Sequence, residues 1–195
     1  MCEYRLSAVA ALSPPNREPK PVGSFQLTEL TEVSIASVAS RNTFTEECGQ
    51  SFAQFIGVDI PAIGQFVRGA VHSAFWSAPG QWFVLSSHNT NEELAGDLKD
   101  AIGSGVSVSE QNDAWTCFEL TGSGLNSVFE RLAGFDVHSF STGDVVRTTI
   151  EHMGCFVLCL ETSNLFQLLV ARSYARAMSH AVLQAFQSSA ALEKV

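Results

Sequence analysis

The chain has 195 residues and a formal net charge of -9 at pH 7, with 20 Asp and Glu against 11 Lys and Arg. Because this charge repels phosphate backbones, we do not expect nucleic acid as a partner. No apolar run approaches the roughly 18 residues of a membrane span, and residues 1–12 lack the basic start and apolar core of a signal peptide. We therefore expect a cytoplasmic protein that is long enough to bury its own core.

Residues 1–24 are predicted to form an extended arm. Four of the six prolines lie in this stretch, namely Pro14, Pro15, Pro19 and Pro21. Proline fixes φ and lacks a backbone N–H donor, so the stretch cannot join the interior of a sheet. The alternative is a disordered tail, and any order in the arm is expected to come from a partner.

Residues 25–104 are predicted to form a first α+β unit. Its opening, residues 25–39, is rich in Thr, Val and Ile and is typical of strands. A helix is expected to begin at Thr43, where Glu46 completes the spacing of a capping box, and to end at Gly57.

The first unit continues with a predicted strand pair over residues 74–87, joined by a tight turn over residues 77–81. A second helix follows. Either Asn89 or Asn91 is expected to cap its start, and Gly103 to end it.

Residues 105–195 are predicted to repeat this order as a second α+β unit. Residues 106–120 contain its first strand sequence, and the next helix is capped by Ser123 and ended by Gly134. Ser173 is expected to cap a final helix. The strands between these two helices are predicted over residues 145–150, 155–160 and 166–171.

The two units match in register as well as in order. One shift along the chain places Phe52 on Phe129 and Gly57 on Gly134, in the apolar stripe and at the end of the first helix of each unit. The sequence therefore predicts an α+β fold of two intertwined ββαββα-like units with antiparallel sheets.

Five cysteines are scattered through the sequence, at Cys2, Cys48, Cys117, Cys155 and Cys159. Their number is odd and the chain is too long to need disulfides, so five reduced thiols are expected. The nearest approach to a metal motif is His152 with Cys155 and Cys159. In a strand the two cysteines would stand about 13 Å apart, too far to share an ion. We therefore expect these thiols to pack in the core.

No catalytic, cofactor-binding or metal-binding residue is assigned. The five histidines are spread along the chain, no nucleophile signature is present, and a dinucleotide glycine fingerprint is lacking. The stretch Thr121–Gly124 precedes a predicted helix and could hold an anion, but its glycines do not match a phosphate loop, which favours a serine cap.

An aromatic hairpin carries the predicted partner interface, at Trp76, Pro79, Trp82 and Phe83. These residues could line a pocket for a planar ligand, pack on the core of the chain itself, or anchor a partner. Since side chains alternate along strands, at least one aromatic ring is expected to point away from the core.

Three motifs resemble one family. The run Trp76-Ser77-Ala78-Pro79-Gly80-Gln81-Trp82-Phe83-Val84-Leu85 is similar to the W-x-x-P-x-x-W-x-x-L signature of the gamma subunit of heterotetrameric sarcosine oxidase. The segments Val108–Trp115 and Leu120–Gly122 resemble the opening of its second half, and Phe166–Ala175 resembles its ending. Gly80 and Gln81 depart from the acidic pair expected in the turn. A looser likeness extends to the folate-binding fold of the glycine-cleavage T-protein.

The resemblance implies a subunit without an active site of its own in an enzyme that demethylates sarcosine oxidatively and passes the one-carbon unit to tetrahydrofolate. FAD, FMN, NAD and tetrahydrofolate would belong to the other subunits, and none of them to this chain. The chief partner would be the alpha subunit, and a homo-oligomer is the alternative for the isolated chain. Whether the chain counts as an enzyme is left open.

The alternative function is a stand-alone folate or one-carbon binding module. A pterin ring needs a buried carboxylate to pair with its N–H donors, and Glu119 and Glu151 are the candidates in predicted strands.

Overall fold

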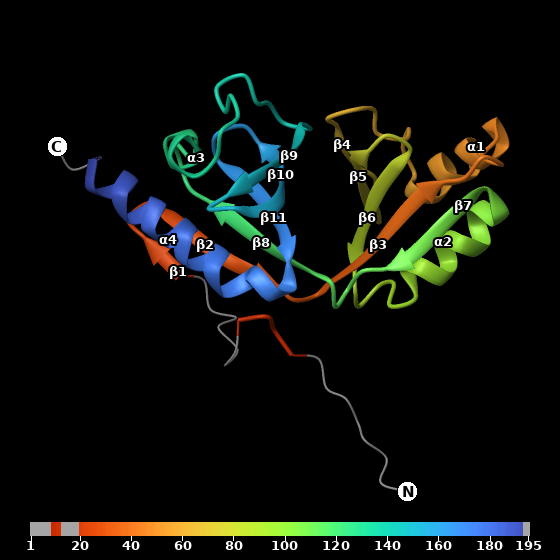
Figure 1. The fold of residues 1–195 in the computed structure, drawn as a ribbon, viewed down its shortest axis with the longest axis horizontal. Helices are drawn as coiled ribbons and strands as arrows, with labels where there is room; N and C mark the ends of the chain where they lie inside the picture. Colours follow the sequence, from red (N-terminus) through yellow and green to blue (C-terminus); the bar gives the residue numbers. More distant parts are fainter. Residues whose placement is uncertain (1–8, 13–19, 193–195) are drawn as a thin grey trace, which may run out of the picture.

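In the computed structural model, residues 9–12 and 20–192 are described, and they form four layers (Figure 1). Two sheets face each other in the middle, with α3 (Asn126–Leu132) and α4 (Ala175–Leu192) outside one sheet. The other sheet is covered by α1 (Glu46–Ile56) and α2 (Leu94–Ile102). None of the described helices is long and apolar enough to cross a membrane.

The two sheets exchange strands. The six-stranded sheet has the order β1-β2-β8-β11-β10-β9 and the five-stranded sheet β4-β5-β6-β3-β7, with every pair antiparallel. The strands are β1 (Lys20–Val22), β2 (Phe25–Leu30), β3 (Val33–Ser40), β4 (Phe66–Arg68), β5 (His72–Ala78), β6 (Gln81–Ser87), β7 (Val106–Glu110), β8 (Trp115–Thr121), β9 (Val145–Ile150), β10 (Met153–Glu161) and β11 (Leu165–Ala171). Strand β2 pairs with β8 of the second half and β7 with β3 of the first, so the prediction of intertwined units is confirmed.

The duplication is visible in register and in packing. Leu27 of β2 pairs with Leu120 of β8, just as Val108 of β7 pairs with Val38 of β3. Behind each sheet an aromatic pair repeats. The ring centroids of Phe52 and Trp82 lie 5.6 Å apart, and those of Phe129 and Phe166 lie 4.7 Å apart. Each half has the order ββαβββα, because β4 adds a strand that the sequence prediction omitted in the first half.

Three apolar clusters separate the four layers. One lies between the six-stranded sheet and α3 and α4, and another between the five-stranded sheet and α1 and α2. The third fills the space between the sheets and contains Phe75, Phe83 and Phe156. Both faces of each sheet are therefore covered, which explains why strands such as β10 are apolar over most of their length.

Several predicted helix ends are wrong in detail. Thr45 rather than Thr43 caps α1, accepting a hydrogen bond from the backbone N–H of Cys48 at 3.4 Å, and Gly57 ends it in the left-handed conformation as predicted. Neither Asn89 nor Asn91 caps α2, which begins after Glu93 without a side-chain cap, although Gly103 follows its end.

The second-half helices differ as well. Helix α3 has Leu125 at its N-cap instead of Ser123, and its last residue is followed by Ala133 rather than Gly134. A 3-10 turn, Arg172–Tyr174, precedes α4, so Ser173 lies inside that turn. A tight 3-10 turn satisfies the terminal backbone groups without a serine cap.

Part of the predicted arm is built into the fold. Residues 20–22 form β1, an edge strand in which Pro21 pairs with Gln26, and edge strands tolerate proline. Residues 9–12, the N-terminal strap, lie against the body of the chain, where Leu12 is buried in the core. The expectation that order in the arm comes only from a partner is therefore wrong for these residues. Pro14, Pro15 and Pro19 lie outside the described residues.

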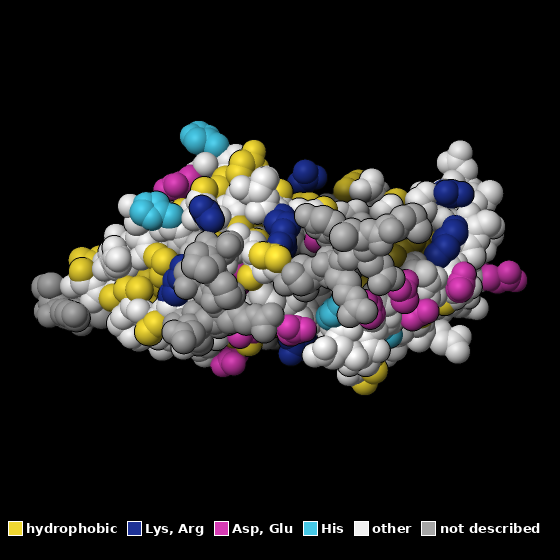
Figure 2. Space-filling view, turned by 90° about the horizontal axis from the view of Figure 1, so that it is seen from below, with side chains coloured by type: hydrophobic (Ala, Val, Ile, Leu, Met, Phe, Trp, Pro, Cys, Tyr) yellow, Lys and Arg dark blue, Asp and Glu magenta, His cyan; other side chains and the backbone are white. Residues whose placement is uncertain are grey.

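Charge is unevenly distributed over the surface. On the face seen in Figure 2, acidic side chains gather on the right half, where Figure 1 places α1 and α2. Exposed acids of these helices and the residues before α2 are Glu46, Glu47, Glu92, Glu93, Asp97 and Asp100. A partner that approaches this side would need a basic or neutral surface.

Candidate functional site

The aromatic hairpin, formed by β5 and β6, turns at Pro79 and Gly80. Gly80 has a φ of 66°, and a Cβ there would lie 2.4 Å from the Ser40 hydroxyl oxygen. Because a side chain fits poorly in that conformation and space, the backbone requires glycine at this position. Glycine in place of the acidic residue expected from the resemblance thus has a local structural reason at this position.

The four predicted interface residues point in different directions. Phe83 is buried between the sheets, while the Trp82 indole lies on the helix side and donates from Nε1 to the carbonyl of Pro61 at 3.1 Å. Trp76 is half-buried, and Pro79 is exposed at the tip. The structure therefore does not gather the three rings into one exposed patch. Their role in a partner interface stays a prediction.

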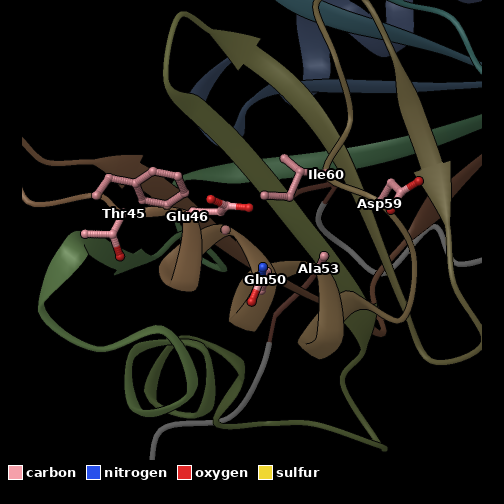
Figure 3. A pocket seen from close by; sticks show the side chains of 8 residues that line it. Thr45, Glu46, Gln50, Ala53, Asp59 and Ile60 are labelled. Atoms are coloured by element: carbon pink, nitrogen blue, oxygen red, sulfur yellow. The ribbon is translucent and has the colours of Figure 1, made fainter.

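A groove of about 450 Å³ lies beside α1 (Figure 3). Gln50 and Ala53 come from the helix, and Asp59 and Ile60 from the loop that follows it. Phe44 also lines the groove, and its ring centroid lies 6.2 Å from that of Trp82. We call these residues the α1 groove. No residue of the aromatic hairpin lines this groove; the hairpin contacts it through the packing of Trp82 on Phe44.

The loop after α1 adds an exposed apolar residue that the sequence analysis missed. Ile63 is 77% exposed, three residues beyond Ile60. The signal was the segment Val58–Gln65, in which apolar residues surround Pro61 in a loop between two elements. Single exposed apolar side chains are common on protein surfaces, so Ile63 is a candidate contact only together with the neighbouring groove that Ile60 lines.

The N-terminal strap is held by a buried carboxylate. Glu29 of β2 is only 7% exposed, and its carboxylate accepts hydrogen bonds from the backbone N–H groups of Ala11 at 2.7 Å and Leu12 at 3.1 Å. The Thr116 hydroxyl donates to the same carboxylate at 3.4 Å. Arg172 donates to the carbonyl of Val9. These contacts join the strap to β2 and to Arg172, which follows β11.

The sequence analysis missed Glu29 although a signal exists. In residues 25–30 the inward positions are Phe25, Leu27 and Glu29, so alternation places a carboxylate on the core side of the strand. A buried charge needs hydrogen-bond partners, and here it has three.

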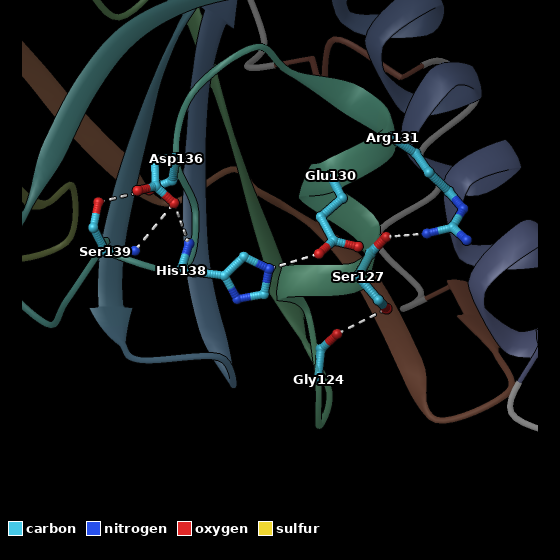
Figure 4. A network of polar contacts seen from close by, with 7 residues as sticks. All are labelled: Gly124, Ser127, Glu130, Arg131, Asp136, His138 and Ser139. Carbon is cyan, nitrogen blue, oxygen red and sulfur yellow. Dashed lines mark hydrogen bonds and ion pairs between the residues drawn. The ribbon is translucent and has the colours of Figure 1, made fainter.

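The histidines serve separate local roles. His72 stacks on Phe55 with ring centroids 4.5 Å apart, and burial lowers its pKa. His88 contacts the Ser34 hydroxyl through Nδ1 at 3.0 Å, while His152 and His180 are exposed. His138 pairs with Glu130 at 2.6 Å on the surface (Figure 4). The arrangement places no two of them in a common site.

The polar contacts around α3 are those of local turns (Figure 4). The Asp136 carboxylate accepts from the backbone N–H groups of His138 and Ser139, and the Ser127 hydroxyl donates to the carbonyl of Gly124. Such contacts fix the chain on either side of the helix. They give no support to an anion site at residues 121–124.

The candidate carboxylates for a pterin lie apart in the fold. Glu151 is exposed in the β9–β10 turn with a φ of 46°, so its predicted place in a strand is wrong. Glu119 is half-buried on β8, where it is paired with Gln167 and Thr28 of the neighbouring strands.

The residues of the possible metal motif are also separated. His152 is exposed in the β9–β10 turn, whereas Cys155 and Cys159 are buried in the core as expected. No group of three metal-ligating residues forms among residues 9–12 and 20–192.

The four described cysteines are free thiols in two environments. Burial raises the pKa of Cys117 and Cys155 to about 12 and that of Cys159 to about 11. In contrast, a hydrogen bond from the Thr45 hydroxyl lowers the pKa of the half-buried Cys48. Because the thiolate is the reactive form, burial keeps three thiols inert and leaves Cys48 accessible.

We expect iodoacetamide at pH 8 to modify only Cys48 in the folded Cys2→Ser variant. At that pH a thiol with a pKa of about 11 is ionised to about one part in a thousand, and access is blocked as well. Peptide mapping by mass spectrometry measures the modified positions, and a Cys48→Ser variant is the control. Equal labelling of Cys117 or Cys155 in folded protein would contradict this assignment.

Comparison with known proteins gives a consistent result. The family model of the sarcosine oxidase gamma subunit family matches residues 42–189, while no curated protein matches the sequence. The fold is similar to heterotetrameric sarcosine oxidase from Corynebacterium sp. U-96 in complex with pyrrole 2-carboxylate, with a TM-score of 0.75 and 15% identity over 88% of both chains.

A second solved structure shares the fold. Glycine cleavage system aminomethyltransferase T from Bartonella henselae is similar with a TM-score of 0.61 and 13% identity, over 80% of this chain and 45% of that chain. The predicted α+β fold related to the T-protein is thereby confirmed. Since the family model covers well over half of the sequence, the chain belongs to the sarcosine oxidase gamma subunit family.

Proposed function

We propose that this chain is an assembly subunit of a sarcosine oxidase complex, with the chemistry carried out by the other subunits. Membership of the gamma subunit family carries this proposal. The alpha subunit is the proposed chief partner. In that role the chain supplies a rigid four-layer body and a docking surface rather than reactive groups.

The chemistry of the described residues supports this role. A nucleophile needs a nearby base and an orienting group. The buried thiols have raised pKa values, and the histidines are held apart by separate contacts with Phe55, Ser34 and Glu130. What the arrangement offers instead is a groove beside α1, lined by apolar side chains and by the carboxylates of Glu46 and Asp59.

The function is tested by expressing the other sarcosine oxidase subunits with and without this chain. We expect the complex to form in good yield only when the chain is present, and the purified chain to be colourless and unable to oxidise sarcosine. Size-exclusion chromatography and the visible spectrum measure both results. A stoichiometric flavin spectrum or turnover of sarcosine by the pure chain would contradict the proposal.

The α1 groove with Ile63 is the proposed docking surface. Replacing Ile63 with aspartate is expected to reduce recovery of the alpha subunit about tenfold, because it places a charge at an apolar contact without disturbing the core. Co-purification on a tag carried by this chain measures the effect.

The matched control is Val71→Asp, since Val71 is also exposed, at 54%, in a loop away from the groove. Both variants should unfold at the same temperature as the native chain. Equal recovery of the alpha subunit by Ile63→Asp and native chain would show that docking uses another surface.

The alternative, a folate or one-carbon binding module, has less support. Of its two candidate carboxylates, Glu151 is in an exposed turn and only Glu119 is partly enclosed. Titration of the isolated chain with a reduced folate tests it, and saturable micromolar binding that Glu119→Gln abolishes would favour the module.

A further inference from the structure

A crevice between the two sheets carries an aromatic wall and one cation. The ring centroids of Phe83 and Trp115 lie 5.4 Å apart, and each lies 5.6 Å from that of Phe156. The guanidinium carbon of Arg147 lies 5.7 Å from the Phe156 centroid. These four residues border a cavity of about 310 Å³ and define what we call the aromatic crevice.

The charge of the aromatic crevice differs from that of its surroundings. Among its lining residues Arg147 is the only charged one, while four other pockets on the described residues each contain a carboxylate, such as Glu46 or Glu32. In a chain with 20 acidic residues, this cavity combines a cation with no acid. Within the described part of the chain, Arg147 makes no hydrogen bond or ion pair, so its donors are available.

The duplication supplies an internal comparison. Arg68 is the third residue of β4 as Arg147 is of β9, and it borders an equivalent crevice on the other side of the inter-sheet space. There Val33, the first residue of β3, replaces Trp115, the first residue of β8.

The other residues that line the Arg68 crevice are also less aromatic than those of the aromatic crevice. Gln167 takes the place of Phe83, and Glu32 adds a carboxylate. The two halves thus keep an arginine at the same place but differ in what surrounds it. The Arg68 guanidinium carbon lies 6.0 Å from the centroid of one ring, that of Phe66, which does not line the crevice. The Arg147 side instead joins the cation to a cavity wall of three aromatic rings.

We propose that the aromatic crevice binds a small planar anion of the aromatic carboxylate class. The ring lies against the half-buried Trp115, and the carboxylate takes paired hydrogen bonds from the Arg147 guanidinium. Gln81 and Gln111 also line the cavity, and the Gln111 side chain donates from Nε2 to the Ser37 hydroxyl at 3.0 Å. The volume is at the small end of ligand sites, which fits a ligand of one or two rings.

The test uses 2-naphthoate as the probe and the full chain as the protein. We expect saturable binding by calorimetry and quenching of tryptophan fluorescence that a Trp115→Phe variant loses. The uncharged 2-naphthamide has the same shape and should bind at least about tenfold more weakly, because it lacks the charge-assisted contact.

Two matched variants locate the site. Arg147→Gln should weaken naphthoate binding by at least about tenfold, whereas Arg68→Gln should leave it within about twofold. Both arginines are exposed, so neither change disturbs the core. Equal weakening by the two variants, equal binding of the amide, or no saturable binding of naphthoate overturns the proposal. The last result would leave the crevice to an acidic segment of a partner protein.

Discussion

Replacing Glu29 with glutamine is expected to lower the free energy of unfolding by about 2 kcal/mol. The carboxylate accepts from two backbone N–H groups of the strap and from the Thr116 hydroxyl. The residue is only 7% exposed to solvent. An amide offers one acceptor oxygen and turns two donors toward other donors. At least one buried N–H of Ala11 or Leu12 is then left without a partner.

Urea unfolding measures this effect as a lower midpoint at an unchanged slope. Glu119→Gln is the matched control, because that carboxylate is on the neighbouring strand but is half-buried. It should change stability by less than about 0.5 kcal/mol. Deleting residues 1–12 should also destabilise the fold, since it leaves the Glu29 carboxylate buried without two of its donors.

Limited proteolysis gives a second measurement. In Glu29→Gln the strap should be cleaved faster than in the native chain, while the body remains intact. If both the deletion and Glu29→Gln unfold at the native urea concentration, the strap is not fastened by this carboxylate. Such a result would return residues 9–12 to the partner-dependent arm that the prolines predicted.

Local patterns in the sequence predicted much of the fold. The turn residues Pro79 and Gly80 located the first hairpin, and Gly57 and Gly103 located two helix ends. The alignment of Phe52 with Phe129 predicted the duplication. Both rings are fully buried, and each packs against an aromatic ring of the sheet that its helix covers. These features depend on spacing within one element, which a single sequence records.

Features that depend on distant contacts were not predictable in this way. Strand β4 has only three residues and is recognised by its pairing with β5, and the strap is held by Glu29 from 17 or 18 positions away. Helix caps failed where 3-10 turns or unassisted starts replace a polar side chain, as at Ser173 and Asn91. Tertiary packing decides such ends, and local propensity does not.

The partner interface at the hairpin stays a prediction, but the structure shows why its rings are not exposed together. Alternation in the hairpin correctly placed Phe83 and Trp82 on opposite faces, but both faces are covered in the fold. The sequence did not reveal that a second sheet covers one face and α1 the other. One of the exposed apolar residues, Ile63, lies instead in the loop after α1, three residues beyond Ile60 of the groove.

Trp82→Ala is expected to lower the free energy of unfolding by about 3 kcal/mol. The indole contacts Phe52 edge to face, stacks on Phe44 and donates to the carbonyl of Pro61, so truncation leaves a cavity behind α1 and an unpaired carbonyl. The repeat gives an equivalent change. Phe166→Ala removes the ring that packs on Phe129 and should cost a similar amount or more, because Phe166 is fully buried.

Separating this stability effect from docking decides what the aromatic hairpin does. Trp82→Phe keeps a ring against Phe52 and loses only the indole N–H, so it should cost about 1 kcal/mol and leave recovery of the alpha subunit unchanged. Trp76→Ala, which removes a half-buried ring, tests the hairpin surface directly. The free energy of unfolding of Trp82→Ala could instead lie within about 1 kcal/mol of that of the native chain while recovery of the alpha subunit is lost. In that case Trp82 is a docking residue, because lost stability does not explain the lost binding.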